Sequence, residues 1–105
     1  MQYDVIIATR NRSDVIGHAV KTIRTQSRLP HKIIVVDSSE DPRPTESAVR
    51  SALCASNISF EFVQSPANSS LQRNIGLTKV ESPIVMFPDD DVFWLDGAAE
   101  AVMRI

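Results

Sequence analysis

Hydrophobic and polar positions follow two different periods along this chain, and the period switches repeatedly. Short apolar runs, mostly continuous and rich in β-branched residues, lie at 3–8, 32–37, 58–64 and 83–88. Runs of this length and composition are typical of strands covered on both faces of a sheet. The pattern therefore predicts four strands, of which those at 3–8 and 32–37 are buried, whereas the strand at 58–64 alternates through Ile58, Phe60 and Phe62.

The segments that separate these runs carry apolar residues at helical spacing. The predicted helices begin at residues typical of helix starts, which are, in chain order, Ser13, Pro44 or Thr45, Asn68 or Ser69, and Asp96. The first helix should end before Pro30. Gly76, inside the third helix, costs about 1 kcal/mol relative to alanine, which indicates close packing against another element.

The strands and helices thus alternate, and the connections are too long for hairpins. This order predicts an α/β fold with a mostly parallel sheet and helices packed on its faces. In open sheets of this kind, ligands bind at the carboxyl ends of the strands. The polar residues expected at that edge are the TRNR segment at 9–12, Asp37 and the run Asp89–Asp91.

The three consecutive aspartates need an explanation, because two like charges about 4 Å apart repel by about 4 kcal/mol at an effective dielectric constant of 20. A solvated turn and a bound cation are both open interpretations. In extended backbone, Asp89 and Asp91 would face one side and Asp90 the other. Two carboxylates on one side suit Mg²⁺ or Mn²⁺, which take oxygen ligands and fill the remaining positions with water and phosphate.

Composition and charge narrow the function classes. The 105 residues fit one domain, 1–105, and no apolar run approaches the roughly 18 residues that span a bilayer. With no signal-like N-terminus, we expect a cytoplasmic protein. Residues 1–36 hold six Lys/Arg against two Asp/Glu, whereas residues 37–105 hold five against eleven. Such segregation suits a site with both an anionic ligand and a metal, and the net charge of −2 argues against a nucleic-acid partner.

Four segments together resemble a known family. The sequences VIIATRNR, IIVVDSSED, SLQRNIGL and PIVMFPDDDV, in this order and spacing, are similar to the nucleotide-binding half of a family 2 glycosyltransferase. The resemblance covers essentially the whole chain. It implies a Rossmann-like GT-A half-domain with strand order 3-2-1-4 and helices on both faces. It also implies a nucleoside-diphosphate sugar as ligand and Mn²⁺ or Mg²⁺ as cofactor.

The same resemblance implies roles for individual residues. Thr9 and Arg10 would line the nucleoside pocket, and Arg73 would lie over the nucleoside. Asp37 would accept a hydrogen bond from the base. A carboxylate can pair with the imino N–H of uracil, thymine or guanine but not with adenine, and we expect a UDP-type donor. The run Asp89–Asp91 matches the DxD signature, in which Asp89 and Asp90 would contact the nucleotide, and Asp91, with Asp89, the metal.

The chain departs from the family pattern in length. Family 2 domains continue beyond the DxD segment with an acceptor-binding half and a general base, so we expect a truncated domain with no catalytic residue of its own. The alternative is a non-catalytic nucleotide-binding or interaction module with the same fold. The strand at 83–88 would be an unprotected sheet edge, and the apolar C-terminal helix would lack part of its cover, which predicts a homo-oligomer formed through this strand or this helix.

Overall fold

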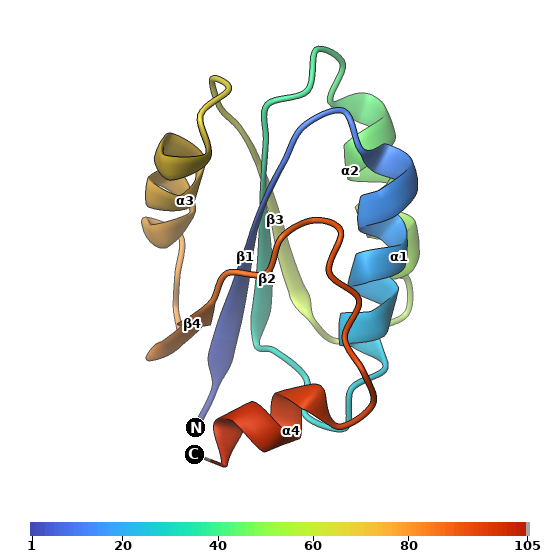
Figure 1. Cartoon of the computed structure of the whole chain (residues 1–105), viewed down its shortest axis with the longest axis vertical. Coiled ribbons are helices and arrows are strands. Elements are labelled where there is room, and N and C mark those ends of the chain that lie inside the picture. Colours follow the sequence, from blue (N-terminus) through green and yellow to red (C-terminus); the bar gives the residue numbers. More distant parts are fainter. Residues whose placement is uncertain (105) are drawn as a thin grey trace.

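Strands and helices alternate throughout residues 1–104, the part of the chain that the computed structural model describes (Figure 1). In chain order they are β1 (Tyr3–Thr9), α1 (Ser13–Arg24), β2 (Lys32–Asp37), α2 (Arg43–Ala52), β3 (Ser59–Gln64), α3 (Ser69–Leu77), β4 (Ile84–Met86) and α4 (Ala98–Met103). All eight predicted elements are present.

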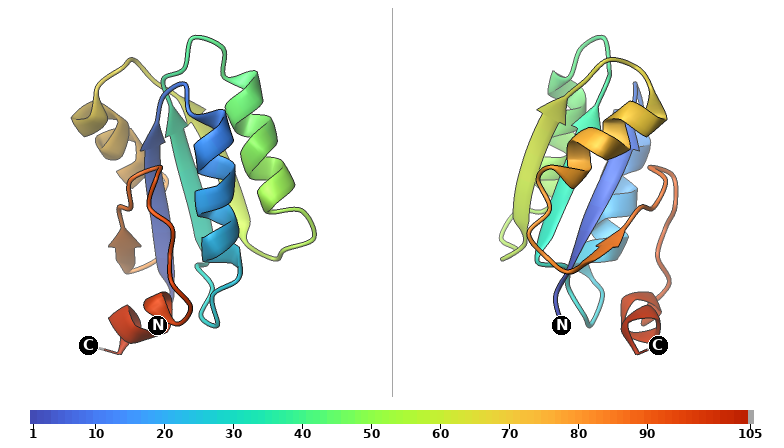
Figure 2. Two further views of the ribbon diagram at one scale, coloured as in Figure 1. Left: turned by 45° about the vertical axis from the view of Figure 1, so that its right-hand side comes forward. Right: turned by 90° about the vertical axis from the view of Figure 1, so that its left-hand side faces the viewer.

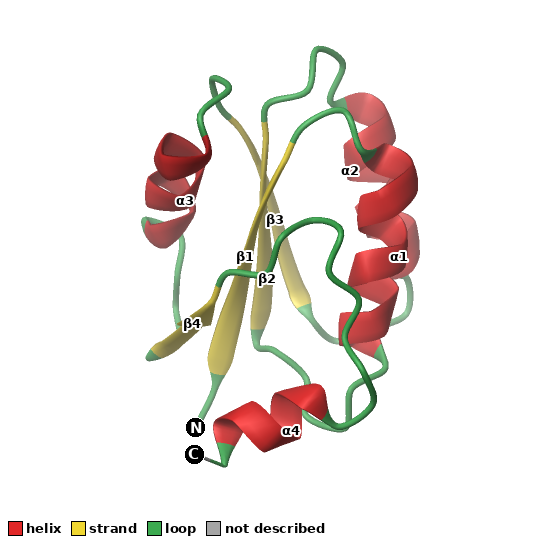
Figure 3. Ribbon diagram, viewed as in Figure 1, coloured by secondary structure: helices red, strands yellow, loops and turns green. Residues whose placement is uncertain are grey.

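The four strands form one parallel sheet in the order β3-β2-β1-β4, which confirms the predicted topology (Figure 3). Thr9 at the end of β1 lies opposite Asp37 at the end of β2. The carboxyl ends of β1 and β2 therefore lie at one edge of the sheet. The chain leaves each of them there into a polar loop.

Both faces of the sheet are covered, as the continuous apolar runs predicted. Side chains alternate along each strand. Val5, Ile7 and Val35 belong to a large core on the α1 and α2 face, whereas Ile6 and Ile34 belong to a smaller core on the α3 face. Helices α1 and α2 lie on one side of the sheet and α3 on the other (Figure 1).

Gly76 allows α3 to approach the sheet closely. A Cβ built on Gly76 would lie 2.6 Å from Cγ2 of Ile6 and 3.3 Å from its Cδ1, closer than atoms can pack without a shift. This confirms the close packing that the sequence indicated at this position. The approach matters for function because the first turn of α3 lies at the carboxyl edge of the sheet.

Strand β4 is shorter than predicted. It covers Ile84–Met86 rather than 83–88 and pairs only with β1, from Tyr3 to Val5. Pro88 has no N–H group for a sheet hydrogen bond, which helps explain why the strand ends early. The chain therefore leaves the sheet at residues 87 and 88, before the aspartates are reached.

Two of the predicted helix caps are wrong and one is confirmed. Asn68 caps α3, since its side-chain oxygen accepts a hydrogen bond from the N–H of Leu71 at 3.0 Å. Helix α1 is preceded by Arg12 rather than Ser13 at the N-cap position. Helix α4 follows Gly97, whose φ of 80° favours glycine, and not Asp96.

The segment that follows the aspartates is hydrogen-bonded to α1 and to Gln26, which follows the end of that helix. The hydroxyl of Thr22 accepts from the N–H of Trp94 at 2.8 Å, and the amide of Gln26 donates to Leu95 O at 2.9 Å and accepts from Ala99 N at 3.0 Å. Helix α4 thus lies near the amino ends of the strands, beside the N-terminus (Figure 2). Within residues 1–104, no helix is both long and apolar enough to cross a bilayer.

Candidate functional site

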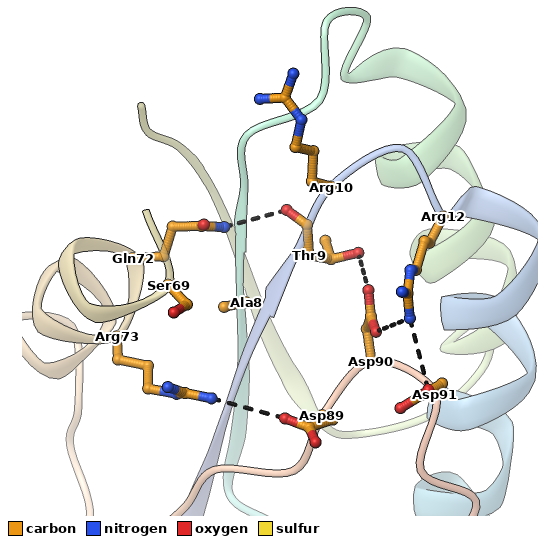
Figure 4. A pocket seen from close by; sticks show the side chains of 10 residues that line it. All are labelled: Ala8, Thr9, Arg10, Arg12, Ser69, Gln72, Arg73, Asp89, Asp90 and Asp91. Carbon is orange, nitrogen blue, oxygen red and sulfur yellow. Dashed lines mark hydrogen bonds and ion pairs between the residues drawn. The ribbon is translucent and has the colours of Figure 1, made fainter. Parts of the chain in front are cut away.

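A polar cavity of about 530 Å³ opens at the carboxyl ends of β1 and β4 (Figure 4). It lies between the first turn of α3 and the first turn of α1. Its walls are built by Ala8, Thr9, Arg10, Arg12, Ser69, Gln72, Arg73, Asp89, Asp90 and Asp91. Three arginines and three aspartates therefore face one cavity.

The aspartates lie in a turn, so the extended backbone assumed from the sequence is wrong. The N–H of Val92 donates to Asp89 O at 3.2 Å, which closes the turn over these residues. Asp90 points inward and is 8% exposed. Asp89 and Asp91 have side chains that are 69% and 57% exposed.

Asp90 anchors the turn to the end of β1. Its Oδ2 accepts from the Thr9 hydroxyl at 2.8 Å, and its Oδ1 accepts from Arg12 Nη1 at 3.1 Å. Both oxygens are therefore engaged by donors of the chain itself. Asp90 joins segments that are about eighty residues apart in the sequence.

Each aspartate is paired with an arginine. Arg12 Nη1 also lies 3.5 Å from Asp91 Oδ2, and Arg73 Nη2 lies 3.6 Å from Asp89 Oδ1. Figure 4 shows Arg12 and Arg73 reaching the turn from opposite sides. The repulsion among the carboxylates is thus relieved by guanidinium groups, and the lining is close to neutral as it stands.

Helix α3 contributes Ser69, Gln72 and Arg73, of which only Arg73 was predicted from the sequence. Gln72 is 5% exposed, and its Nε2 donates to Val36 O at 2.8 Å and to Thr9 O at 3.1 Å. It ties α3 to the carboxyl ends of two strands. The signal in the sequence was the spacing of three and four residues, which places these side chains on one face of a helix.

Arg10 points away from the aspartates (Figure 4). Its Nη1 donates to Ser38 O at 3.3 Å, and its Nη2 lies 3.9 Å from Glu40. Asn11 follows with a positive φ of 53°, and its N–H donates to the Ser39 hydroxyl at 2.8 Å. The loop after β1 is therefore joined to the loop after β2.

Asp37 lies near this cavity without lining it. It is 1% exposed, and its Oδ1 accepts from the Ser39 hydroxyl at 2.6 Å. Its Oδ2 is buried and has no hydrogen-bond partner among the described residues. Burial raises the pKa of the Asp37 carboxyl above its usual value, and the hydrogen bonds from Ser39 oppose that rise. An unpaired buried acceptor is costly, which makes Asp37 a candidate for contact with a donor outside the chain.

Six of the seven predicted site residues meet around the cavity: Thr9, Arg10, Arg73, Asp89, Asp90 and Asp91. Asp37 is the exception. Arg12 also lines the cavity; the sequence placed it at this edge within the TRNR segment but gave it no role. Ala8, Ser69 and Gln72 are lining residues that the sequence did not indicate.

The fit of a metal ion to these residues is partial. Among residues 1–104, no group of three or more His, Cys, Asp or Glu side chains comes together as a metal site would. The donor chemistry is nevertheless suitable, because Mg²⁺ is commonly bound by one or two carboxylates with water and phosphate in the other positions. Asp89 and Asp91 are exposed enough to act in that way.

Comparison with protein families gives one result that covers nearly the whole chain. A family model described as glycosyl transferase family 2 matches residues 4–104. A search of curated proteins finds no significant match.

Solved structures with the same fold include those of the S. aureus protein TarS. TarS 1–349 in complex with UDP-GlcNAc matches with a TM-score of 0.80 and 24% identity, over 99% of this chain and 30% of that chain. TarS 1–349 in complex with UDP matches with a TM-score of 0.74 and 22% identity, over 99% of this chain and 31% of that chain. At this identity the likeness shows the fold alone. The chain spans about a third of the length of the TarS 1–349 structures that it matches, and 19% of the longer TarS chain.

Proposed function

The chain belongs to glycosyl transferase family 2, and from that premise we propose that its cavity binds a nucleoside-diphosphate sugar together with a divalent cation. The observation that carries the proposal is the meeting of arginines and aspartates at one end of the sheet. Guanidinium groups suit phosphate oxygens, and carboxylates suit a hard cation. A metal diphosphate needs both.

The exposed carboxylates Asp91 and Asp89 would hold the cation, Mn²⁺ or Mg²⁺. When bound, such an ion neutralises the negative charge that develops on the departing nucleoside diphosphate. Asp90 would contact the nucleotide from its fixed position beside Thr9. The longer Arg73–Asp89 contact, at 3.6 Å, leaves that arginine able to turn toward a ligand.

The base would be recognised near the ends of β1 and β2. The unpaired Oδ2 of Asp37 would accept the imino N–H of uracil, thymine or guanine. Thr9, Arg10 and Arg73 would surround the nucleoside. The solved complexes of TarS with UDP and UDP-GlcNAc motivate a UDP-type ligand as the first candidate.

Calorimetric titration tests this proposal directly. UDP, GDP, dTDP and ADP are each titrated into the protein with and without Mn²⁺. We expect UDP to bind most tightly, Mn²⁺ to strengthen binding, and ADP to bind most weakly. Absence of binding by every nucleotide in the presence of Mn²⁺ would refute the proposal.

A non-catalytic nucleotide-binding or interaction module is the alternative. It shares the ligand but not the reaction. Sugar transfer by the 105-residue chain in an acceptor-dependent assay would exclude this alternative. We expect binding without transfer from this chain alone, since it spans only part of the matched structures. Transfer would show that the chain contains a complete catalytic apparatus.

The proposal includes self-association of this chain through β4. This strand is at the edge of the sheet, and exposed apolar side chains, Phe87, Phe93 and Leu95, follow it closely. Unpaired strand edges and contiguous apolar patches favour association. Light scattering on the purified chain decides the matter, and an 11.6 kDa monomer at high concentration would refute it.

A further inference from the structure

Arg12 places one nitrogen atom between two carboxylates. Its Nη1 lies 3.1 Å from Asp90 Oδ1 and 3.5 Å from Asp91 Oδ2. Within residues 1–104, these are the contacts of its guanidinium with other side chains, so Nε and Nη2 remain available as donors. A cation of the protein itself thus stands where neighbouring carboxylates converge.

The two contacts of Arg12 differ in strength. Asp90 is largely buried, and its second oxygen is held by the Thr9 hydroxyl at 2.8 Å. Asp91 is 57% exposed and its contact with Arg12 is longer. Exposed ion pairs contribute little free energy because water competes for both partners. Asp91 is therefore the carboxylate that can exchange its partner.

The backbone of Arg12 is held in place while its side chain remains half exposed. Its carbonyl accepts from the N–H groups of Val15 and Ile16, both at 3.0 Å, as the residue that precedes α1. The side chain is 52% exposed. A guanidinium on a fixed backbone position can thus change partners without a change in the fold.

We infer that Arg12 is a replaceable counter-cation of the proposed site, a role that rests on the proposed function. In the free protein it neutralises Asp90 and Asp91. A divalent cation takes Asp91 from it, and the guanidinium then donates its free N–H groups to the diphosphate that the cation carries. Arg12 is thereby a binding residue that couples the two ligands.

This exchange has consequences of opposite sign for the two ligands. A divalent cation without nucleotide must displace Arg12 and gains no phosphate contact, so it binds weakly. When a diphosphate binds without a cation, Arg12 is still paired with Asp90 and Asp91, so it does not contact the phosphates and the diphosphate binds weakly. When both ligands are present, the cation binds Asp91 and the diphosphate binds the guanidinium of Arg12 that the cation has released. Cation and diphosphate should therefore strengthen each other's binding by the same factor.

The test compares Arg12→Gln with Arg104→Gln. Arg104 is an exposed arginine that directly follows α4, the helix beside the N-terminus (Figure 1), and it pairs with Glu100 of that helix. Its replacement matches the loss of one positive charge. Binding of Mn²⁺ alone is measured by electron paramagnetic resonance of the free ion. Binding of UDP is measured by calorimetry at zero and at saturating Mn²⁺.

We expect Arg12→Gln to bind Mn²⁺ alone about fivefold more tightly than the parent, and to bind UDP at saturating Mn²⁺ about fivefold more weakly, which is the size expected for a half-exposed ion pair. The mutual strengthening of the two ligands should fall. Arg104→Gln should match the parent in all three measurements. A residue that only supports the fold would not improve Mn²⁺ binding when it is removed.

The outcomes separate this inference from the proposed function. If the parent does not bind UDP with Mn²⁺, the proposed function fails. If the parent binds both but Arg12→Gln shows no gain in affinity for Mn²⁺ alone, the inference is overturned and the function stands. Should Arg12→Gln fail to fold, as judged by circular dichroism, Arg12→Met removes the charge, keeps the apolar stem and is judged by the same criteria.

Discussion

Asp4 and Asp37 are both buried, at 0% and 1% exposure, yet their carboxylates are satisfied to different degrees. Asp4 lies near the amino end of β1. Its Oδ2 accepts from Glu81 N at 2.7 Å and Ser82 N at 3.1 Å, and its Oδ1 from the Ser82 hydroxyl at 2.6 Å. Asp37 ends β2, accepts from Ser39, and leaves Oδ2 without a partner among the described residues.

The same contrast extends to the charged groups around these residues. At the amino end, Lys32 is largely buried, and its ammonium lies 2.8 Å from Glu61 and donates to Lys79 O at 2.9 Å. At the carboxyl end, the arginines pair with the aspartates over 3.1 to 3.6 Å, and most of these side chains are half exposed or more. The amino end is arranged for stability, whereas the carboxyl end keeps groups that a ligand can engage.

Removing the two buried carboxylates should have unequal effects on stability. Asp4→Ala leaves three donors without an acceptor, so the free energy of unfolding should fall by about 2 to 4 kcal/mol. Asp37→Ala removes an unsatisfied carboxylate and should change it by less than about 1 kcal/mol. Urea denaturation followed by circular dichroism measures both, and equal losses would contradict the contrast.

For ligand binding, we expect the larger effect from a change at Asp37 rather than at Asp4. Asp37→Asn replaces an acceptor by a donor where the base is proposed to bind, so affinity for UDP should fall by about 1 to 3 kcal/mol. Calorimetry with Mn²⁺ present measures the change. Unchanged affinity for UDP, GDP and dTDP would count against base recognition by Asp37.

The aspartate turn offers a comparison on a smaller scale, between a buried and an exposed carboxylate. Asp91→Ala should remove most of the strengthening of UDP binding by Mn²⁺, with little change in stability. Asp90→Ala should instead lower the free energy of unfolding by about 1 to 2 kcal/mol, because Thr9 and Arg12 lose their shared acceptor. Equal effects of both variants on the Mn²⁺ contribution would exclude the metal role of Asp91.

The smallest effect is a pH dependence of stability that arises from Asp37. Its pKa is raised in the folded protein, mainly by burial, so the folded state holds this proton more tightly than the unfolded state. Stability should therefore fall as pH rises from the usual carboxyl pKa to the raised one, and should then level off. Asp37→Asn lacks this contribution. The difference in unfolding free energy between the two proteins should follow the same curve, and a constant difference would exclude it.

The order and type of the elements were predictable from the sequence, because apolar period is a local property. Continuous runs such as KIIVVD at 32–37 can only be covered on both faces, and alternation with helical segments then requires parallel strands. Gly76 indicated that its helix packs closely against another element, although the sequence did not show that the contact is with Ile6 of β1. Strand 83–88 was predicted too long, because its apolar residues continue after its pairing with β1 has ended.

The location of the site could be predicted from the sequence, but most of the contacts within it could not. Parallel topology brings the strand ends together, so most of the candidate residues were correctly expected at one rim. Asp37 was expected at the same rim as a contact of the base, and it lies beside the cavity without lining it. Arg12 was expected at this edge within the TRNR segment at 9–12 but was given no role, and Gln72 was not singled out, because no local pattern indicates the role of a charge or an amide.

The amino-acid sequence by itself determined the sheet, its order of elements and the polar edge, since these follow from hydrophobic period and chain connectivity. Only the tertiary structure decided which carboxylate is buried. In an extended strand, Asp89 and Asp91 would face the same side. In the structure a turn places Asp90 inside, where it accepts hydrogen bonds from Thr9 and Arg12. That choice depends on donors about eighty residues away in the sequence. Hydrogen bonding between such distant groups is set by packing, which no local pattern encodes.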